Sequence, residues 1–92
     1  MTKKLYVLVD SFLTGGQKIA QAAHAVGQFA LDNPKLLREW NNGIVIIKQS
    51  RDLAAWEKLC DASFREPYWE NRLTALAAFR GEGFAAELPL VS

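Results

Sequence analysis

The sequence contains a single cysteine, Cys60, and a single histidine, His24. A lone cysteine cannot form an internal disulfide, and it cannot supply a cluster of thiolates for a metal ion. A metal cluster built on histidines, or a mechanism that needs two of them, is excluded for the same reason. We therefore expect neither a metal site nor a cofactor in this chain.

An excess of charge of one sign is also lacking, because eleven Lys and Arg residues balance ten Asp and Glu residues to a net charge of +1. Strong non-specific binders of nucleic acid usually carry a clear basic excess, so a nucleic-acid partner would have to meet a local patch. The first apolar run covers only residues 5–9, which is too short for a signal-peptide core or a membrane span. We expect a cytoplasmic protein with no membrane partner.

Half of the 92 residues are hydrophobic, which is the composition of one globular domain. Hydrophobic periodicity and turn signals predict the elements of the first half. These are a buried strand over 4–9, a helix over 15–31, a short helix from Asn33-Pro34 through Trp40 to Asn42-Gly43 with Asn33 as its cap, and a second buried strand over 44–48. Strand, helices and strand form a βαβ unit, so the two strands should be parallel and joined by a right-handed crossover.

The second half predicts a third helix and a third strand. The helix should begin at Ser50 and run to about Phe64, with its inward face formed by Leu53, Trp56, Leu59 and Cys60. Residues 65–71 form a loop or short edge segment, and residues 72–79 are β-rich. The final segment, Leu88–Val91, should dock as an extended piece.

The first helix is predicted to start at a capping box, in which Thr14 and Gln17 exchange hydrogen bonds. Its apolar face at helical spacing is Ile19, Ala22, Ala23, Val26, Phe29 and Ala30. The opposite stripe contains Gln17, Gln21, His24 and Gln28. Amide and imidazole groups both donate and accept hydrogen bonds, so this stripe suits a polar ligand. The alternative is a plain surface helix with a satisfied histidine.

Several other residues are candidates for a site. Lys18, beside the Gly15-Gly16 turn, is placed for a phosphate or carboxylate at the helix N-terminus. Asp10 closes the first strand, where ligands bind in parallel α/β sheets, although it suits a turn equally well. Tyr68 and Trp69 can stack on a base or ribose, or they can cover a sheet edge. Cys60 is better explained as a buried thiol than as a nucleophile paired with His24.

The order of motifs resembles the type 2 peptidyl-tRNA hydrolases of archaea and eukaryotes. The similar stretches cover nearly the whole chain: Gly16-Gln17-Lys18-Ile19-Ala20-Gln21-Ala22-Ala23-His24-Ala25, Asn33-Pro34 through Trp40, Leu73-Thr74-Ala75-Leu76-Ala77, and Leu88-Pro89-Leu90. The resemblance implies an α/β fold with three α/β/α layers and a mixed four-stranded sheet. It also implies hydrolysis of the ester that joins a peptide to the 3′ ribose of tRNA.

Under this resemblance the first helix presents its stripe to the tRNA end and the ester. Catalytic roles are expected for Gln17, Lys18, His24 and Glu66. Substrate contacts are expected for Gln21, Gln28, Asp10 and Thr74. The lysine would hold a phosphate or oxyanion, and His24 and Gln21 would orient reacting groups.

The chain departs from the family pattern at two places. The family's lysine position is occupied by Gln17, and Lys18 follows one residue later, which is about 100° of rotation on a helix. The family's Asp-Ala-Gly-x-Thr loop is replaced by residues 64–71, in which Glu66 can substitute as the carboxylate. The chain therefore resembles more closely a short branch of this superfamily that carries a Phe-x-Glu-Pro stretch.

Three hypotheses follow. The first is an esterase that acts on peptidyl-tRNA through an activated water and positioned polar groups. The second is a non-catalytic binder of tRNA ends, of a nucleotide or of a protein, through the same helix face. The third is a small assembly module, in which the three tryptophans help to bury a homodimer interface.

Overall fold

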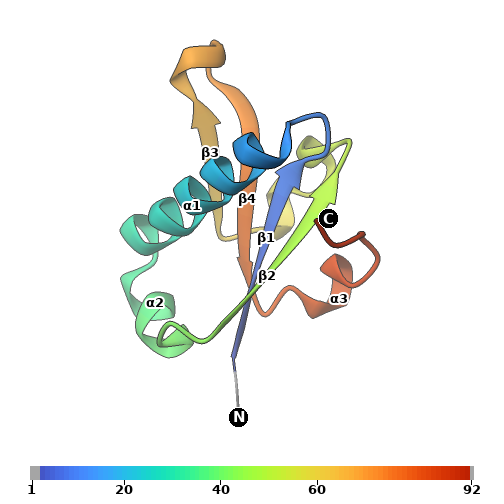
Figure 1. Cartoon of the computed structure of the whole chain (residues 1–92). Coiled ribbons are helices and arrows are strands. Elements are labelled where there is room, and N and C mark those ends of the chain that lie inside the picture. The colour runs from blue at the N-terminus through green and yellow to red at the C-terminus, as the bar shows by residue number, and fades with distance from the viewer. Residues whose placement is uncertain (1–2, 92) are drawn as a thin grey trace.

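The sheet is built on β1 (Lys4–Asp10), whose residues 5–10 are all buried. In the computed structural model, which describes residues 3–91, this strand lies between two neighbours (Figure 1). It pairs in parallel with β2 (Ile44–Ser50) and antiparallel with β4 (Arg72–Phe79), and β3 (Ala62–Glu66) pairs antiparallel with β4. The strand order is β2-β1-β4-β3. The predicted mixed four-stranded sheet and its parallel first pair are confirmed. The prediction that β2 is a buried strand is wrong, because β2 is an edge of the sheet and its residues Ile44 and Val45 are exposed.

Both faces of the sheet are covered, because successive side chains of β1 point to opposite faces. Leu5, Val7 and Val9 pack in one cluster with residues of α1 (Gly15–Asp32) and α2 (Pro34–Trp40). Tyr6 and Leu8 pack in a second cluster with the short turns after β2 and with α3 (Glu82–Ala85). Figure 1 shows α1 lying across one side of the sheet and α3 on the other. No helix within residues 3–91 is both long and apolar enough to cross a membrane.

Helix α1 begins at the predicted capping box. Thr14 Oγ1 accepts the Gln17 N–H at 3.2 Å, and Gln17 Oε1 accepts the Thr14 N–H at 2.9 Å. These two bonds satisfy two of the backbone donors that every helix leaves free at its N-terminus. The first turn has no acidic residue, so the Thr14-to-Gln17 capping box is the side-chain signal that marks the helix start.

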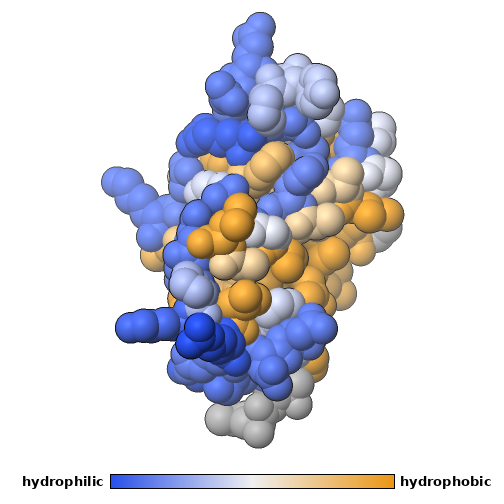
Figure 2. Space-filling view, turned by 90° about the vertical axis from the view of Figure 1, so that its left-hand side faces the viewer, coloured by the Kyte–Doolittle hydropathy of each residue, from blue (hydrophilic) through white to orange (hydrophobic). Residues whose placement is uncertain are grey.

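The face of α1 that packs on the sheet differs from the predicted face by a rotation about the helix axis. Its buried residues are Gln21, Ala22, Ala25 and Phe29, whereas Ile19 is 70% exposed and Ala23 is exposed. Apolar side chains consequently remain on the outer surface of this helix, and Figure 2 shows apolar and polar residues interspersed on this side of the molecule. The helix rolls this way because Ala22 and Ala25 allow close approach to the sheet and because Gln21 finds buried polar partners there.

The predicted helix from Ser50 to Phe64 is wrong. Two 3₁₀ turns, η1 (Leu53–Ala55) and η2 (Glu57–Leu59), are followed by strand β3, and Leu59 is exposed rather than inward. The Asp61 N–H donates to the Ala77 carbonyl at 2.8 Å, and Asp61 Oδ2 accepts the Phe79 N–H at 2.7 Å. Pairing with β4 thus outweighs the helical spacing of the apolar residues, which is local and ambiguous.

Helix α2 and the last segment form as predicted, apart from the cap of α2 and an additional helix, α3. Helix α2 forms, but Asn33 does not cap it through its side chain; Asn33 Nδ2 donates to the Phe29 and Asp61 carbonyls instead. The last segment docks on β2, since the Gln49 N–H donates to the Pro89 carbonyl at 2.9 Å. The short helix α3 was not predicted from the sequence.

Phe29 tests this account of the core, because its fully buried ring packs against Trp40 and Phe79. Phe29→Ala should lower the free energy of unfolding by about 3–5 kcal/mol. Phe12→Ala, at an exposed ring, should change it by less than about 0.5 kcal/mol. Urea unfolding monitored by circular dichroism measures both, and equal losses would contradict the assigned helix face.

Candidate functional site

A buried chain of hydrogen bonds joins three polar side chains that are distant in the sequence. The Thr74 hydroxyl donates to Gln21 Oε1 at 2.6 Å, and Gln21 Nε2 donates to Glu66 Oε1 at 2.9 Å. Thr74 is fully buried, Gln21 is 4% exposed and Glu66 is 9% exposed. Helix α1, strand β4 and the end of strand β3 each supply one member, so this polar chain exists only in the folded domain.

The chemistry of the three side chains sets the direction of each hydrogen bond between Thr74, Gln21 and Glu66. Glu66 is an acceptor when ionised, so the Gln21 amide must turn its nitrogen toward the carboxylate. Its oxygen then faces Thr74, whose hydroxyl donates. Every buried side-chain nitrogen or oxygen among residues 3–91 has a hydrogen-bond partner, as expected for a polar group that is costly to bury alone.

Glu66 also organises the segment that follows it. Its Oε2 accepts the Tyr68 N–H at 3.4 Å and thereby caps η3 (Pro67–Trp69). A β-bulge lies just before it, between Phe64 and Arg65, and bulges commonly re-aim side chains near functional sites. A carboxylate oxygen can accept more than one hydrogen bond, so the slightly exposed Glu66 retains capacity for a water molecule.

The structure does not bring Lys18 to this polar chain. Lys18 Nζ donates to Gln49 Oε1 at 2.7 Å, and Gln49 Nε2 donates to the Leu90 carbonyl at 3.0 Å. Gln49 belongs to β2, and β2 and β3 are the opposite edges of the sheet. Lys18 is thus directed toward one edge, while Gln21 reaches the strands near the other edge.

The remaining polar residues of the predicted stripe lie on the surface. Gln17 completes the capping box, and Gln28 Nε2 donates to both carboxylate oxygens of Asp32 at 3.0 and 3.1 Å. His24 is exposed, and its ring stacks on Phe64 with centroids 4.5 Å apart. His24, Gln28 and Phe64 line a shallow groove of about 520 Å³. The four stripe residues are therefore divided, with Gln21 inward and the other three toward solvent.

Asp10 is both a turn residue and half of an ion pair. Its Oδ1 accepts the Phe12 N–H at 2.9 Å, and its Oδ2 accepts from the Arg72 guanidinium. The carboxylate is buried, whereas the Arg72 side chain is 55% exposed. Arg72 was not singled out from the sequence, because its proximity to Asp10 depends on the antiparallel pairing of β1 with β4.

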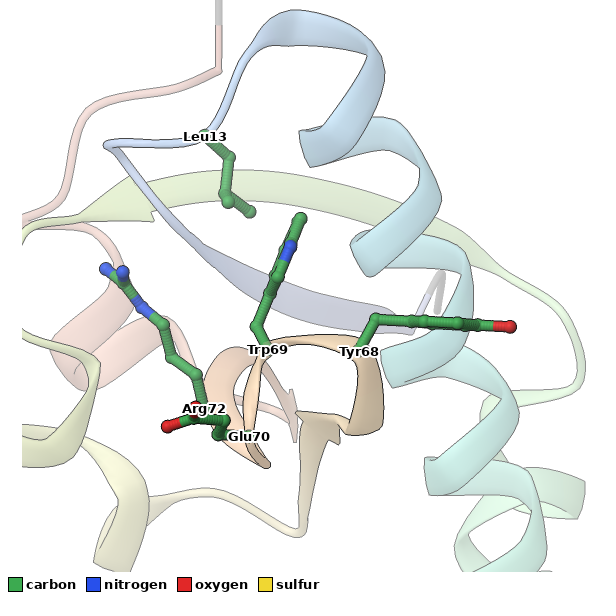
Figure 3. Close-up of a pocket in the computed structure, with 5 residues that line it drawn as sticks. All are labelled: Leu13, Tyr68, Trp69, Glu70 and Arg72. Carbon is green, nitrogen blue, oxygen red and sulfur yellow. The ribbon is translucent and has the colours of Figure 1, made fainter.

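A cleft of about 440 Å³ opens beside this ion pair and is lined by Leu13, Tyr68, Trp69, Glu70 and Arg72. In Figure 3, Trp69 and Arg72 rise from neighbouring parts of the η3–β4 turn, Leu13 extends toward them, and Tyr68 points away. The aromatic pair was recognisable in the sequence, but Leu13 and Arg72 were not.

Cys60 and His24 do not form a nucleophile pair. Cys60 packs with the second core cluster, on the face of the sheet opposite α1. Burial, followed by the charges of Asp61 and Glu57, raises the pKa of the Cys60 thiol to about 12. A thiol in this environment stays protonated and is a poor nucleophile. No cluster of three potential ligands for a metal ion occurs within residues 3–91.

Cys60 should therefore react slowly with iodoacetamide in the folded protein. At pH 8.5 we expect alkylation at least about 100-fold slower than in urea, because the thiolate is scarce when the pKa is raised. The raised pKa also stabilises the fold below the ordinary thiol pKa, and this contribution is lost as pH rises toward 12. Equal alkylation rates in the folded and unfolded protein, followed by mass spectrometry, would contradict the assigned environment.

Gln21→Met keeps the length of the side chain but removes both of its hydrogen bonds. Loss of these partners from Thr74 and Glu66 should lower the free energy of unfolding by about 1–3 kcal/mol. Gln28→Met is the matched control on the same helix and should have little effect, since Gln28 bonds only to exposed Asp32. Thermal unfolding compares the two, and an equal loss would argue against a specific role for the buried chain.

The chain was also compared with known proteins. No protein-family model matches this sequence, and no curated protein matches it.

Proposed function

We propose that this protein hydrolyses the ester between a peptide, or an N-blocked amino acid, and the 3′ ribose of tRNA. The observation that carries the proposal is the hydrogen-bonded chain of Thr74, Gln21 and Glu66. The motif order that resembles type 2 peptidyl-tRNA hydrolases draws attention to these same three residues. Gln21 is 45 positions from Glu66 and 53 positions from Thr74 in the sequence, so a local sequence preference does not explain why the three side chains meet.

Glu66 is the proposed general base. Its carboxylate accepts a proton from a water molecule, whose oxygen attacks the ester carbonyl carbon and forms a tetrahedral intermediate. The intermediate then breaks its bond to the ribose 3′ oxygen, which takes the proton back from Glu66. The products are a free carboxylic acid and the tRNA hydroxyl. Gln21 and Thr74 hold the carboxylate in place and do not exchange protons with the substrate.

The exposed polar residues of α1 are proposed to contact the substrate. Gln17 lies one turn before Gln21 on the helix, and only its Oε1 is used by the capping box. Its amide nitrogen can donate to the oxyanion that develops on the carbonyl oxygen. His24, one turn beyond Gln21, offers a flat ring already stacked on Phe64. Lys18 would have to leave Gln49 in order to reach this side.

Hydrolysis of N-acetyl-aminoacyl-tRNA by the purified protein tests the proposal. Glu66→Gln should reduce kcat by about 10²–10⁴-fold, the usual contribution of a general base. The amide oxygen of glutamine can still accept from Gln21, but its NH2 group cannot accept the Tyr68 N–H. The fold should be retained with the loss of this one bond, which circular dichroism would verify. Glu87→Gln, the same change at an exposed carboxylate beyond α3, should leave kcat unchanged.

Two results would overturn this assignment. Turnover that survives in folded Glu66→Gln would remove Glu66 as the base. Absence of any cleavage by the wild-type protein would rule out the proposed hydrolase function.

A non-catalytic binder of tRNA ends is the second candidate function. This function is favoured because both oxygens of Glu66 already accept hydrogen bonds within the protein. Such a binder would retain a tRNA 3′ end in a salt-dependent manner while leaving its ester intact. Binding and cleavage measured on the same labelled tRNA distinguish the two functions.

A further inference from the structure

The cleft beside the Asp10–Arg72 ion pair combines surfaces that differ in chemistry. Trp69 supplies an aromatic ring, Leu13 an apolar contact, Arg72 a cation and Glu70 a carboxylate. A purely apolar groove would suit a protein side chain, and a purely basic one would suit any anion. One ring, one cation and one carboxylate together match the parts of a single nucleotide: its base, its phosphate and its ribose hydroxyls.

The backbone that presents Trp69 is held by hydrogen bonds at both ends of η3. Glu66 caps η3 through the Tyr68 N–H, and the Asn71 N–H donates to the Glu66 carbonyl at 3.0 Å. Between these bonds, Glu70 and Asn71 adopt left-handed conformations with φ of 53° and 60°. Such a conformation is unfavourable for glutamate, so the surrounding bonds must maintain the turn. Trp69 therefore faces the cleft from a constrained position.

Arg72 is positioned to bind an anion in the same cleft. Its attachment to buried Asp10 uses one guanidinium nitrogen, while more than half of the side chain is exposed. A guanidinium has five N–H donors in a planar fork that fits phosphate oxygens. The ion pair with Asp10 orients that fork and leaves its outer edge accessible.

We propose that this cleft binds the last nucleotide at the 3′ end of a single-stranded RNA. The base stacks on Trp69, the 5′ phosphate of that nucleotide pairs with Arg72, and a ribose hydroxyl donates to Glu70. This inference rests on the proposed function, because Glu66 is both the proposed general base and the residue that caps η3. Glu66 directly precedes η3, the turn that carries Trp69 into the cleft.

Binding of a fluorescein-labelled ten-nucleotide RNA that ends in CCA tests the site through fluorescence anisotropy. Trp69→Leu should raise Kd at least about tenfold, since stacking of one base commonly contributes that much. Trp69→Phe keeps a ring and should bind within about threefold of wild type. Trp56→Phe is the matched control, because Trp56 stacks on Phe84 away from the cleft. Circular dichroism verifies that each variant is folded.

A second RNA tests whether Trp69 contacts the nucleotide at the 3′ end. With an abasic residue as the last nucleotide, wild type and Trp69→Leu should bind equally, because there is no base to stack. Equal Kd values for Trp69→Leu and wild type on the intact RNA would overturn the proposal. So would a tenfold effect that persists on the abasic RNA, which would mean that Trp69 contacts some other part of the strand.

The hydrolysis assay separates this inference from the proposed function. Trp69→Leu should raise KM for N-acetyl-aminoacyl-tRNA and leave kcat within about twofold. If the wild-type protein cleaves nothing yet binds RNA through Trp69, the hydrolase fails and the nucleotide site stands. If it cleaves the ester and Trp69→Leu changes neither KM nor Kd, the hydrolase stands and the nucleotide site fails.

Discussion

Burial of the Gln21 amide is the constraint on which the arrangement of this domain depends. An amide inside a protein is costly unless its donors and acceptor are paired, and Gln21 is paired with Thr74 on β4 and Glu66 at the end of β3. These two bonds determine how α1 is rolled about its axis, and the small residues Ala22 and Ala25 permit the close approach that the bonds require. Exposure of Ile19 is a consequence of that roll.

Glu66 connects the buried chain to the surface. One carboxylate oxygen accepts from Gln21 and the other accepts from the backbone of η3, so the position of Trp69 depends on the same side chain that is proposed to activate water. A substitution at Glu66 would thus alter both chemistry and the neighbouring cleft. This linkage explains why the isosteric change to glutamine is more informative than truncation to alanine.

The sheet order directs Lys18 away from the candidate site and leaves Arg72 beside the neighbouring cleft. Lys18 is attached to Gln49 on the β2 edge, whereas Arg72, at the start of β4, is held by Asp10 beside the Trp69 cleft. Arg72 therefore supplies the cation of this cleft, whereas Lys18 was the cation expected from the sequence. Its planar guanidinium also suits a phosphate that must be held in one orientation.

Local signals in the sequence were sufficient for β1, the capping box of α1, α2, β2, β4 and the docked tail, because each depends on neighbouring residues or on a continuous apolar run. The same signals failed for residues 50–64, where apolar spacing favoured a helix but pairing of Ala62–Glu66 with β4 produced a strand. They also placed Gln21 on the solvent side, because a polar residue is assigned to the surface unless its buried partners are known. Thr74 and Glu66 are more than forty positions away. Only the tertiary structure could decide that these three side chains meet, since hydrogen-bond pairing between distant residues leaves no periodic trace in the sequence.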